Sequence, residues 1–122
     1  LCWRTIILMK HERQRFVSKL DFLTTPGYLG GPRGRARAGL PADTGPYRVV
    51  TDLALLDFSP ATKRMRLLAL NPGVAAADVV AATGFKLAPS PRLKRNPPPT
   101  ALELKTLREK VDPQRIFLKQ SA

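Results

Sequence analysis

Short apolar runs rich in strand-forming residues recur through the first two thirds of the chain. Residues 4–9 (RTIILM) form a β-branched and aliphatic run, which is typical of a strand covered on both faces of a sheet. After a polar connection, residues 16–23 resume the apolar pattern and favour a second strand. Residues 47–58 (YRVVTDLALLDF) and 65–70 (MRLLAL) have strong strand propensity, and the turn-forming residues 59–63 between them predict a β-hairpin.

A short helix is predicted after residues 71–73 (NPG), where the strand pattern breaks. The helix covers residues 74–83, and Gly84 follows at the point where a glycine in the left-handed conformation closes a helix. Ala75 stands where a Ser or Thr cap is expected, so we expect this helix to fray. One further short strand is predicted at residues 85–87.

The last third of the chain reads as a proline-rich arm followed by a helix. Residues 88–99 are basic and rich in proline, a composition with little capacity to bury surface, and we expect an extended arm. Thr100 and Glu103 form a capping box, and the apolar stripe behind them predicts a helix. We therefore predict a partial α/β domain over residues 1–88 and an arm with a C-terminal helix over residues 89–122.

A long loop is predicted between two of the strands, over residues 24–46. It holds six of the eight glycines and four of the twelve prolines, a density at which neither a helix nor a strand ladder propagates. Loops of more than about 12 to 15 residues tend to be functional or disordered in compact domains. Arg33, Arg35 and Arg37 alternate along this loop and point the same way if it is extended.

Length, composition and charge narrow the class of protein. With 122 residues, 43% of them hydrophobic, the chain has enough apolar material for one packed domain. Its apolar runs fall far short of the roughly 20 residues of a membrane span, and no signal sequence is evident, so we expect a cytoplasmic protein without a membrane partner. The formal charge of +12 favours an anionic partner, either nucleic acid or the phosphates of a coenzyme. Because the basic residues are spread without interleaved aromatics, a nucleic-acid-binding module is the less favoured alternative.

The residue types that usually mark metal or histidine-based catalytic sites do not form a complete set. His11 and Glu12 begin like a zinc-protease motif, but Arg15 stands where the second histidine is needed and His11 is the only histidine. A polar turn after the first strand is the preferred interpretation, and no metal site is predicted. Cys2 is the only cysteine, and we expect it to be inert.

Two further patterns also fall short of a catalytic site. The loop glycines match neither the Walker spacing nor the dinucleotide-binding fingerprint, and letting the chain turn is as good an explanation of them as ligand contact. Asp52 and Asp57 lie five residues apart on one predicted strand, so their side chains project from opposite faces and are wrong for joint acid and base work. Solvation at strand ends, or bonds to loop amides, is the preferred role for both.

Several separate motifs, taken in order, resemble the C-terminal half of class I CoA-transferase β subunits, and the glutaconate type is the closest. The resemblance covers nearly the whole chain. It implies the C-terminal part of an open CoA-transferase-like α/β sheet, with a β-hairpin, a long Gly/Pro loop and a C-terminal helix. The motifs are RTIILM at 4–9, FVSKLDFLTTPGY at 16–28, GPYRVVTDLA at 45–54, NPGV at 71–74, ATGF at 82–85 and PPPT at 97–100.

The resemblance implies an activity that this chain does not complete by itself. In that family a glutamate of the β subunit attacks an acyl-CoA and carries CoA as a thioester, and the β subunit pairs with a homologous α subunit. The glutamate belongs to the N-terminal half and no position here matches its motif, so neither Glu12 nor Glu103 is assigned the role. We expect a non-catalytic portion, inactive alone, that works with the α subunit and the missing N-terminal half, with coenzyme A as substrate and no bound cofactor. A CoA-thioester hydrolase subunit of the same family is the alternative.

The resemblance also places the long loop beside the substrate. In the family the turn at residues 25–28 follows a sheet strand, so the loop is a candidate for lining the acyl-CoA cleft or packing on the partner subunit. The loop arginines are predicted to face coenzyme phosphates or an acidic surface of the α subunit, with a solvated loop face as the equal alternative. The candidate substrate-adjacent residues are Thr25, Gly27, Tyr28, Arg33, Arg35 and Arg37.

Overall fold

A computed structural model describes residues 3–41 and 43–117, and the structural statements below refer to these residues. Cys2 lies outside them. The elements, in chain order, are β1 (Arg4–Leu8), α1 (Gly34–Arg37), β2 (Gly45–Val50), β3 (Ala54–Phe58), β4 (Met65–Leu70), α2 (Ala76–Ala81), β5 (Ala88–Arg95), α3 (Ala101–Thr106) and a π-helical turn, η1 (Leu107–Val111).

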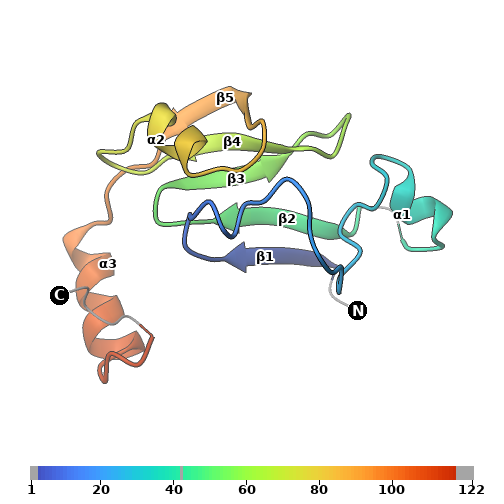
Figure 1. Cartoon of the computed structure of the whole chain (residues 1–122). Helices are drawn as coiled ribbons and strands as arrows, with labels where there is room; N and C mark the ends of the chain where they lie inside the picture. The colour runs from blue at the N-terminus through green and yellow to red at the C-terminus, as the bar shows by residue number, and fades with distance from the viewer. Residues whose placement is uncertain (1–2, 42, 118–122) are drawn as a thin grey trace.

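The strands form one open mixed sheet in the order β1-β2-β3-β4-β5 (Figure 1). The outer pairs, β1 with β2 and β4 with β5, are parallel, whereas β2 with β3 and β3 with β4 are antiparallel. The antiparallel pair of β3 and β4 is the predicted hairpin. The predicted class, an open α/β sheet with a hairpin, a long loop and a C-terminal helix, is confirmed.

Parallel pairing of β1 and β2 explains the long segment between them. Two parallel neighbours need a crossover connection of a dozen or more residues, because the chain must return to the starting end of the sheet. The second strand predicted at residues 16–23 is wrong, since this segment is part of that return. Phe16 alone enters the core, while Phe22 and Leu23 remain 80% and 60% exposed. The loop predicted at 24–46 also contains α1 and the first residues of β2.

The run 47–58, predicted as one strand, is divided by a tight turn between β2 and β3. The buried Thr51 side chain causes the break, because its Oγ1 accepts hydrogen bonds from the amides of Leu53 (3.2 Å) and Ala54 (2.9 Å). A side chain that bonds to nearby amides offers the backbone an alternative to the strand ladder. Local polar chemistry thus outweighs the high strand propensity of the flanking residues.

The fifth strand lies where an arm was predicted. Residues 85–87 form no strand, but Ala88–Arg95 pair with β4 and extend the sheet, so the arm begins only after Arg95. Prolines are tolerated on an edge strand because their missing N–H can face away from the ladder. Helix α3 begins as predicted, with the Glu103 amide donating to Thr100 Oγ1 (3.2 Å) and the Thr100 amide to Glu103 Oε2 (2.7 Å). None of the described helices is long and apolar enough to cross a membrane.

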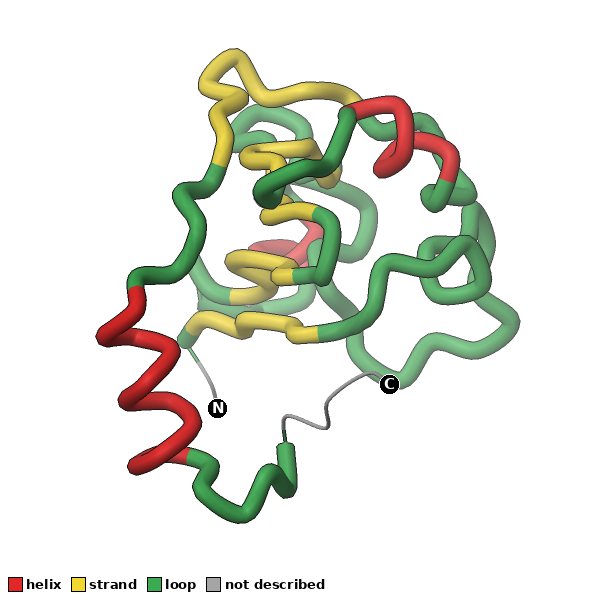
Figure 2. The backbone as a smooth tube through the Cα atoms, turned by 90° about the vertical axis from the view of Figure 1, so that its left-hand side faces the viewer, coloured by secondary structure: helices red, strands yellow, loops and turns green. Residues whose placement is uncertain are grey.

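One face of the sheet carries the hydrophobic core. Figure 2 views the molecule from the side and shows α2 and the crossover loops on one side of the strands, whereas α3 projects away from the sheet. Alternation along each strand sends every second side chain to this covered face. The core residues are Phe16, Val49, Ala54, Leu56, Leu67, Leu70, Val79 and Leu87.

Gly84 has a different role from the one predicted. It is absent from the described glycines with positive φ, so it does not close α2 in a left-handed conformation. Instead its amide donates to the Phe16 carbonyl at 2.6 Å, and a Cβ at this position would overlap that carbonyl. The glycine is required because the crossover loop approaches the end of α2 so closely. At the start of α2, Asp78 Oδ2 accepts from the Ala75 amide (3.1 Å), which supplies half of a capping box.

The buried His11 ring ties the crossover loop to the β2–β3 turn and to the end of α2. Its Nδ1 lies 3.1 Å from Thr51 Oγ1 and its Nε2 lies 2.9 Å from Thr83 Oγ1, and the ring stacks on Phe16. Thr51 Oγ1 already accepts from two amides, so its proton is free for Nδ1, while Nε2–H donates to Thr83 Oγ1, whose proton goes to the Val79 carbonyl. The network is complete with a neutral ring.

Stability is therefore expected to fall as the pH decreases below about 6.5, the ordinary value for histidine. Burial lowers the pKa of His11 in the folded chain, with Asp52 partly opposing the effect. The unfolded chain then binds the proton more readily than the folded chain, so stability is fully present above the ordinary value and is lost as the pH falls through the folded pKa. Thermal midpoints measured between pH 8 and pH 5 test this. His11→Gln should melt lower throughout without this pH dependence; an equal slope in both proteins would contradict the assignment.

Candidate functional site

A cleft of about 770 Å³ opens at the end of the sheet where β2 and β4 begin and β3 ends. Tyr47 and Arg48 at the start of β2 line it, together with Asp57 and Phe58 at the end of β3. The short helix α1 and the start of β1 close one side, and β5 closes the other. The cleft thus gathers residues from every part of the sheet.

Cationic side chains dominate the lining of this basic cleft. Two carboxylates, Asp43 and Asp57, also reach it. Because Arg and Lys outnumber them three to one, the cleft carries a formal charge of +4. The six cationic residues are Arg4, Arg35, Arg48, Lys63, Arg66 and Arg92.

Asp57 and Arg66 form a bidentate ion pair between neighbouring strands. Arg66 donates from Nη2 to Oδ2 (2.7 Å) and from Nε to Oδ1 (3.0 Å), and the two residues are directly opposite in the register of β3 and β4. The Asp57 side chain is only 9% exposed, and the hydrogen bonds to it raise the pKa of Arg66. The expectation of solvation or loop-amide bonds is wrong for Asp57 but holds for Asp52, whose Oδ1 accepts from the His11 amide (2.8 Å).

Arg35 holds the long loop in shape. Its Nη1 donates to the Gly27 carbonyl at 2.8 Å, and its Nη2 and Nε donate to Thr44 Oγ1 at 2.8 and 3.1 Å. Gly45 has φ +116°, and a Cβ there would lie only 3.2 Å from Arg35 Nε. The guanidinium therefore requires a glycine beside it. Arg35 reaches the cleft, but most of its donors are already used by the loop.

Tyr28 also joins the loop to the sheet beside the cleft. Its hydroxyl donates to the Pro46 carbonyl, and its ring packs edge-on against Phe58 with the centroids 5.3 Å apart. Burial raises the pKa of Tyr28. Lys63 Nζ lies 5.4 Å from the centre of this ring, a cation–π arrangement. Tyr28 and Lys63 thus form an aromatic and cationic wall of the cleft.

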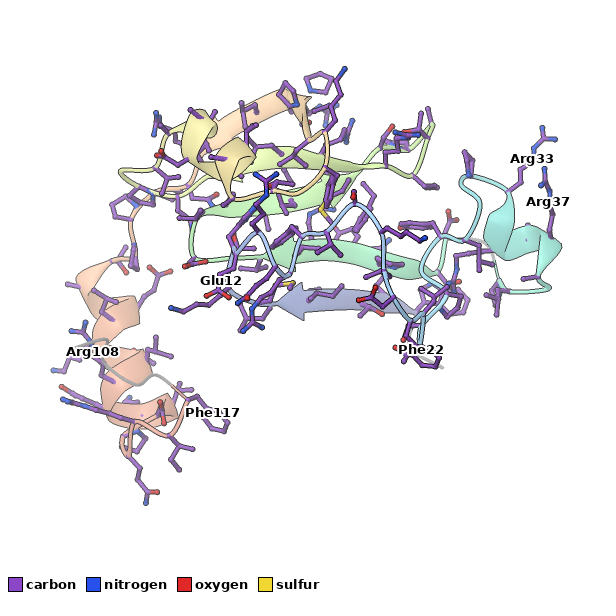
Figure 3. The ribbon with its side chains drawn as sticks, viewed as in Figure 1. Glu12, Phe22, Arg33, Arg37, Arg108 and Phe117 are labelled. Carbon is purple, nitrogen blue, oxygen red and sulfur yellow. The ribbon has the colours of Figure 1, made fainter. Side chains whose placement is uncertain are left out.

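The six sequence-predicted residues do not gather in one place. Arg33 and Arg37 are exposed and project from α1 away from the sheet (Figure 3). Alternating residues point the same way only in an extended chain, whereas a helical turn sends Arg35 to the opposite side from its two neighbours. The exposed Thr25 and the turn glycine Gly27 are not among the residues that line the cleft. Of the predicted set, only Tyr28 and Arg35 line it.

Most cations of the cleft were missed from sequence because they come from separate strands. Arg4 and Arg48 both lie over the Tyr47 ring, with the guanidinium carbons 4.7 and 4.0 Å from its centre. Parallel pairing of β1 with β2 brings these two arginines side by side. Arg92 comes from β5, a strand that was predicted as an arm. Among the described residues, no group of three or more His, Cys, Asp or Glu side chains is placed to hold a metal ion.

The fold and the motifs have clear relatives among known proteins. Residues 2–82 match the family model described as coenzyme A transferase. The chain superimposes on the crystal structure of glutaconate coenzyme A-transferase from Acidaminococcus fermentans with a TM-score of 0.87 and 42% identity, covering 97% of this chain and 45% of that one. The chain belongs to the coenzyme A transferase family.

Within the family, two curated relatives are informative. The β subunit of glutaconate CoA-transferase from Acidaminococcus fermentans is 46% identical over 114 residues, which is 93% of this chain and 42% of that protein. The cholesterol ring-cleaving hydrolase IpdB subunit of Mycobacterium tuberculosis is 36% identical over 70 residues, 57% of this chain and 28% of that protein. The chain thus spans less than half the length of the curated relatives it matches. The predicted resemblance is confirmed.

Proposed function

We propose that this chain is the C-terminal, non-catalytic portion of a CoA-transferase β subunit. In a complex with an α subunit and an N-terminal β-subunit segment, it supports the transfer of CoA between carboxylic acids. Its similarity to the glutaconate CoA-transferase β subunit, through nearly its whole length, is the observation that carries the proposal. The nucleophilic glutamate arrives from outside the chain, because no residue here matches the family's motif.

The exposure of β1 supports the need for a further segment. Its sequence is typical of a strand covered on both faces, yet all five of its residues are exposed, with Ile6 at 63% and Leu8 at 81%. Only β2 pairs with it in the described sheet, so its outer edge has unpaired backbone groups. Such an edge is a template for another strand. We propose that the N-terminal segment of the complete polypeptide covers it.

Reconstitution tests this function. The chain is combined with the α subunit and the N-terminal β-subunit segment of the Acidaminococcus enzyme, and CoA transfer from an acyl-CoA to a free carboxylate is measured. We expect transfer only when all three parts are present. Ile6→Asp should prevent assembly, whereas Arg13→Asp, which places the same charge in the exposed connection after β1, should not. Turnover by the chain alone, or an assembled complex without transfer, would contradict the proposal.

A CoA-thioester hydrolase subunit is the second candidate, favoured by the match to the IpdB hydrolase subunit. The same reconstituted complex separates the two functions. A transferase releases little free CoA until a carboxylate acceptor is added, while a hydrolase releases it with water as the acceptor. A cytoplasmic location and a nucleic-acid-binding role stay predictions, the latter testable by salt-dependent binding of DNA or RNA.

A further inference from the structure

The basic cleft holds more positive charge than the described chain neutralises. Arg66 has its carboxylate partner in Asp57. Among the described residues, Arg4, Arg48, Lys63 and Arg92 are in no ion pair. Cations that converge on one concave surface repel one another and raise the local concentration of anions. The cleft is therefore electrostatically prepared for an anionic ligand.

The arrangement of the arginines suits phosphate more than a single carboxylate. Arg4 and Arg48 lie over the Tyr47 ring, so the face of each guanidinium is used in stacking while donors along its edge remain directed outward. A planar guanidinium edge binds two oxygens of one phosphate. Arg92 approaches from the far side of the cleft, on β5. Cations on both sides match a ligand with two separated phosphate groups, whereas a monocarboxylate would satisfy only one side.

Size and aromatic content indicate a nucleotide. The cleft volume of about 770 Å³ lies within the range of small-molecule sites, roughly 300 to 1,000 Å³. Tyr47 is 37% exposed, and Tyr28 and Phe58 also line the cleft, so an aromatic base has rings against which to pack. These features together favour a phosphorylated nucleoside over a bare inorganic anion.

We propose that the basic cleft binds a nucleotide with two separated phosphates, through Arg48 on β2 and Arg92 on β5 with Tyr47 beside them. This inference rests on the proposed function for the source of the ligand, since one end of coenzyme A is an adenosine that carries phosphate on both its 3′ and 5′ positions. Arg35 shapes the loop wall of the cleft, and Arg66 is held in place by Asp57.

The test measures binding of 3′-phosphoadenosine 5′-phosphate to the 122-residue chain by calorimetry. The double variant Arg48→Gln/Arg92→Gln should weaken binding by at least about tenfold, the loss of one charge-assisted contact. The matched control, Arg33→Gln/Arg37→Gln, removes the same charge from α1, outside the cleft, and should change affinity by less than about twofold. Circular dichroism checks folding. If the double variant is unfolded, the exposed Arg92→Gln alone is used and should still weaken binding.

Three further probes identify which part of the ligand is recognised. Adenosine monophosphate, with one phosphate, and inorganic pyrophosphate, with no base, should each bind more weakly than the bisphosphate, and pantetheine should not compete. No binding of the bisphosphate, equal losses in the cleft and control variants, or competition by pantetheine would overturn the proposal. Because this assay contains no acyl group and no partner chain, it can fail while the reconstituted complex is active, and it can succeed while that complex is inactive.

Discussion

Replacing Leu56 by alanine is expected to lower the free energy of unfolding by about 2 to 5 kcal/mol, or to unfold the chain. Leu56 is fully buried at the centre of the sheet, where β3 pairs with both β2 and β4. Truncation removes its contacts and leaves a cavity, because neighbours on three packed strands cannot collapse freely. Urea denaturation followed by circular dichroism measures the change.

The matched control for this prediction is Leu102→Ala. Leu102 lies on α3 and is 73% exposed, so the same truncation there should change the stability by less than about 0.5 kcal/mol. Comparable losses at the two positions would mean that the sheet does not carry the core described above.

Replacing Asp57 by alanine is expected to cost about 2 to 4 kcal/mol. The change removes both acceptors of Arg66 and leaves its guanidinium without a partner in a cleft that already carries excess positive charge. The lower part of the usual range for broken buried pairs applies, because the Arg66 side chain is 20% exposed and water can reach it. The free energy of unfolding is measured by urea titration.

A double-variant cycle isolates the contribution of this pair. Asp57→Ala/Arg66→Ala should be destabilised by less than the sum of the two single changes, because removing both partners leaves no unpaired charge. Simple additivity would show that the ion pair contributes no coupling. High salt should weaken a surface pair, whereas this shielded pair should keep most of its coupling.

These two residues connect the fold with the proposed ligand site. Leu56 and Asp57 are neighbours on β3 and point to opposite faces, one into the core and the other into the basic cleft. Asp57 orients Arg66 and removes one unit of charge, so the net charge of the cleft depends on a pair placed by the sheet register. The stability of the sheet and the electrostatics of the cleft are therefore coupled.

Local patterns along the chain were sufficient for several elements. The β3–β4 hairpin follows from two apolar runs around turn residues, and α3 begins at Thr100 because two neighbouring side chains satisfy the free amides there. Both depend on contacts between residues close in sequence, which composition and spacing describe well. The family also followed from motif order, since several short motifs in sequence are specific together.

Other features depend on contacts that no local pattern contains. The hydrogen bonds of Thr51 divide one apolar run into β2 and β3, and β5 forms because β4 offers it a free edge. Gly84 was assigned to a helix end, but its reason lies in the Phe16 carbonyl, which is distant in sequence. In each case the three-dimensional setting decides the local conformation.

The sequence by itself determined the family, the class of sheet, the hairpin, the last helix and the lack of the family's nucleophile, because these follow from residue order and near-neighbour chemistry. Only the tertiary structure decided where the charge of +12 is used. The helical turn of α1 sends Arg33 and Arg37 outward, while strand pairing brings Arg4, Arg48 and Arg92 into one cleft. The physical reason is that a cleft is formed by residues that share a position in space, and strand order and register alone bring them together.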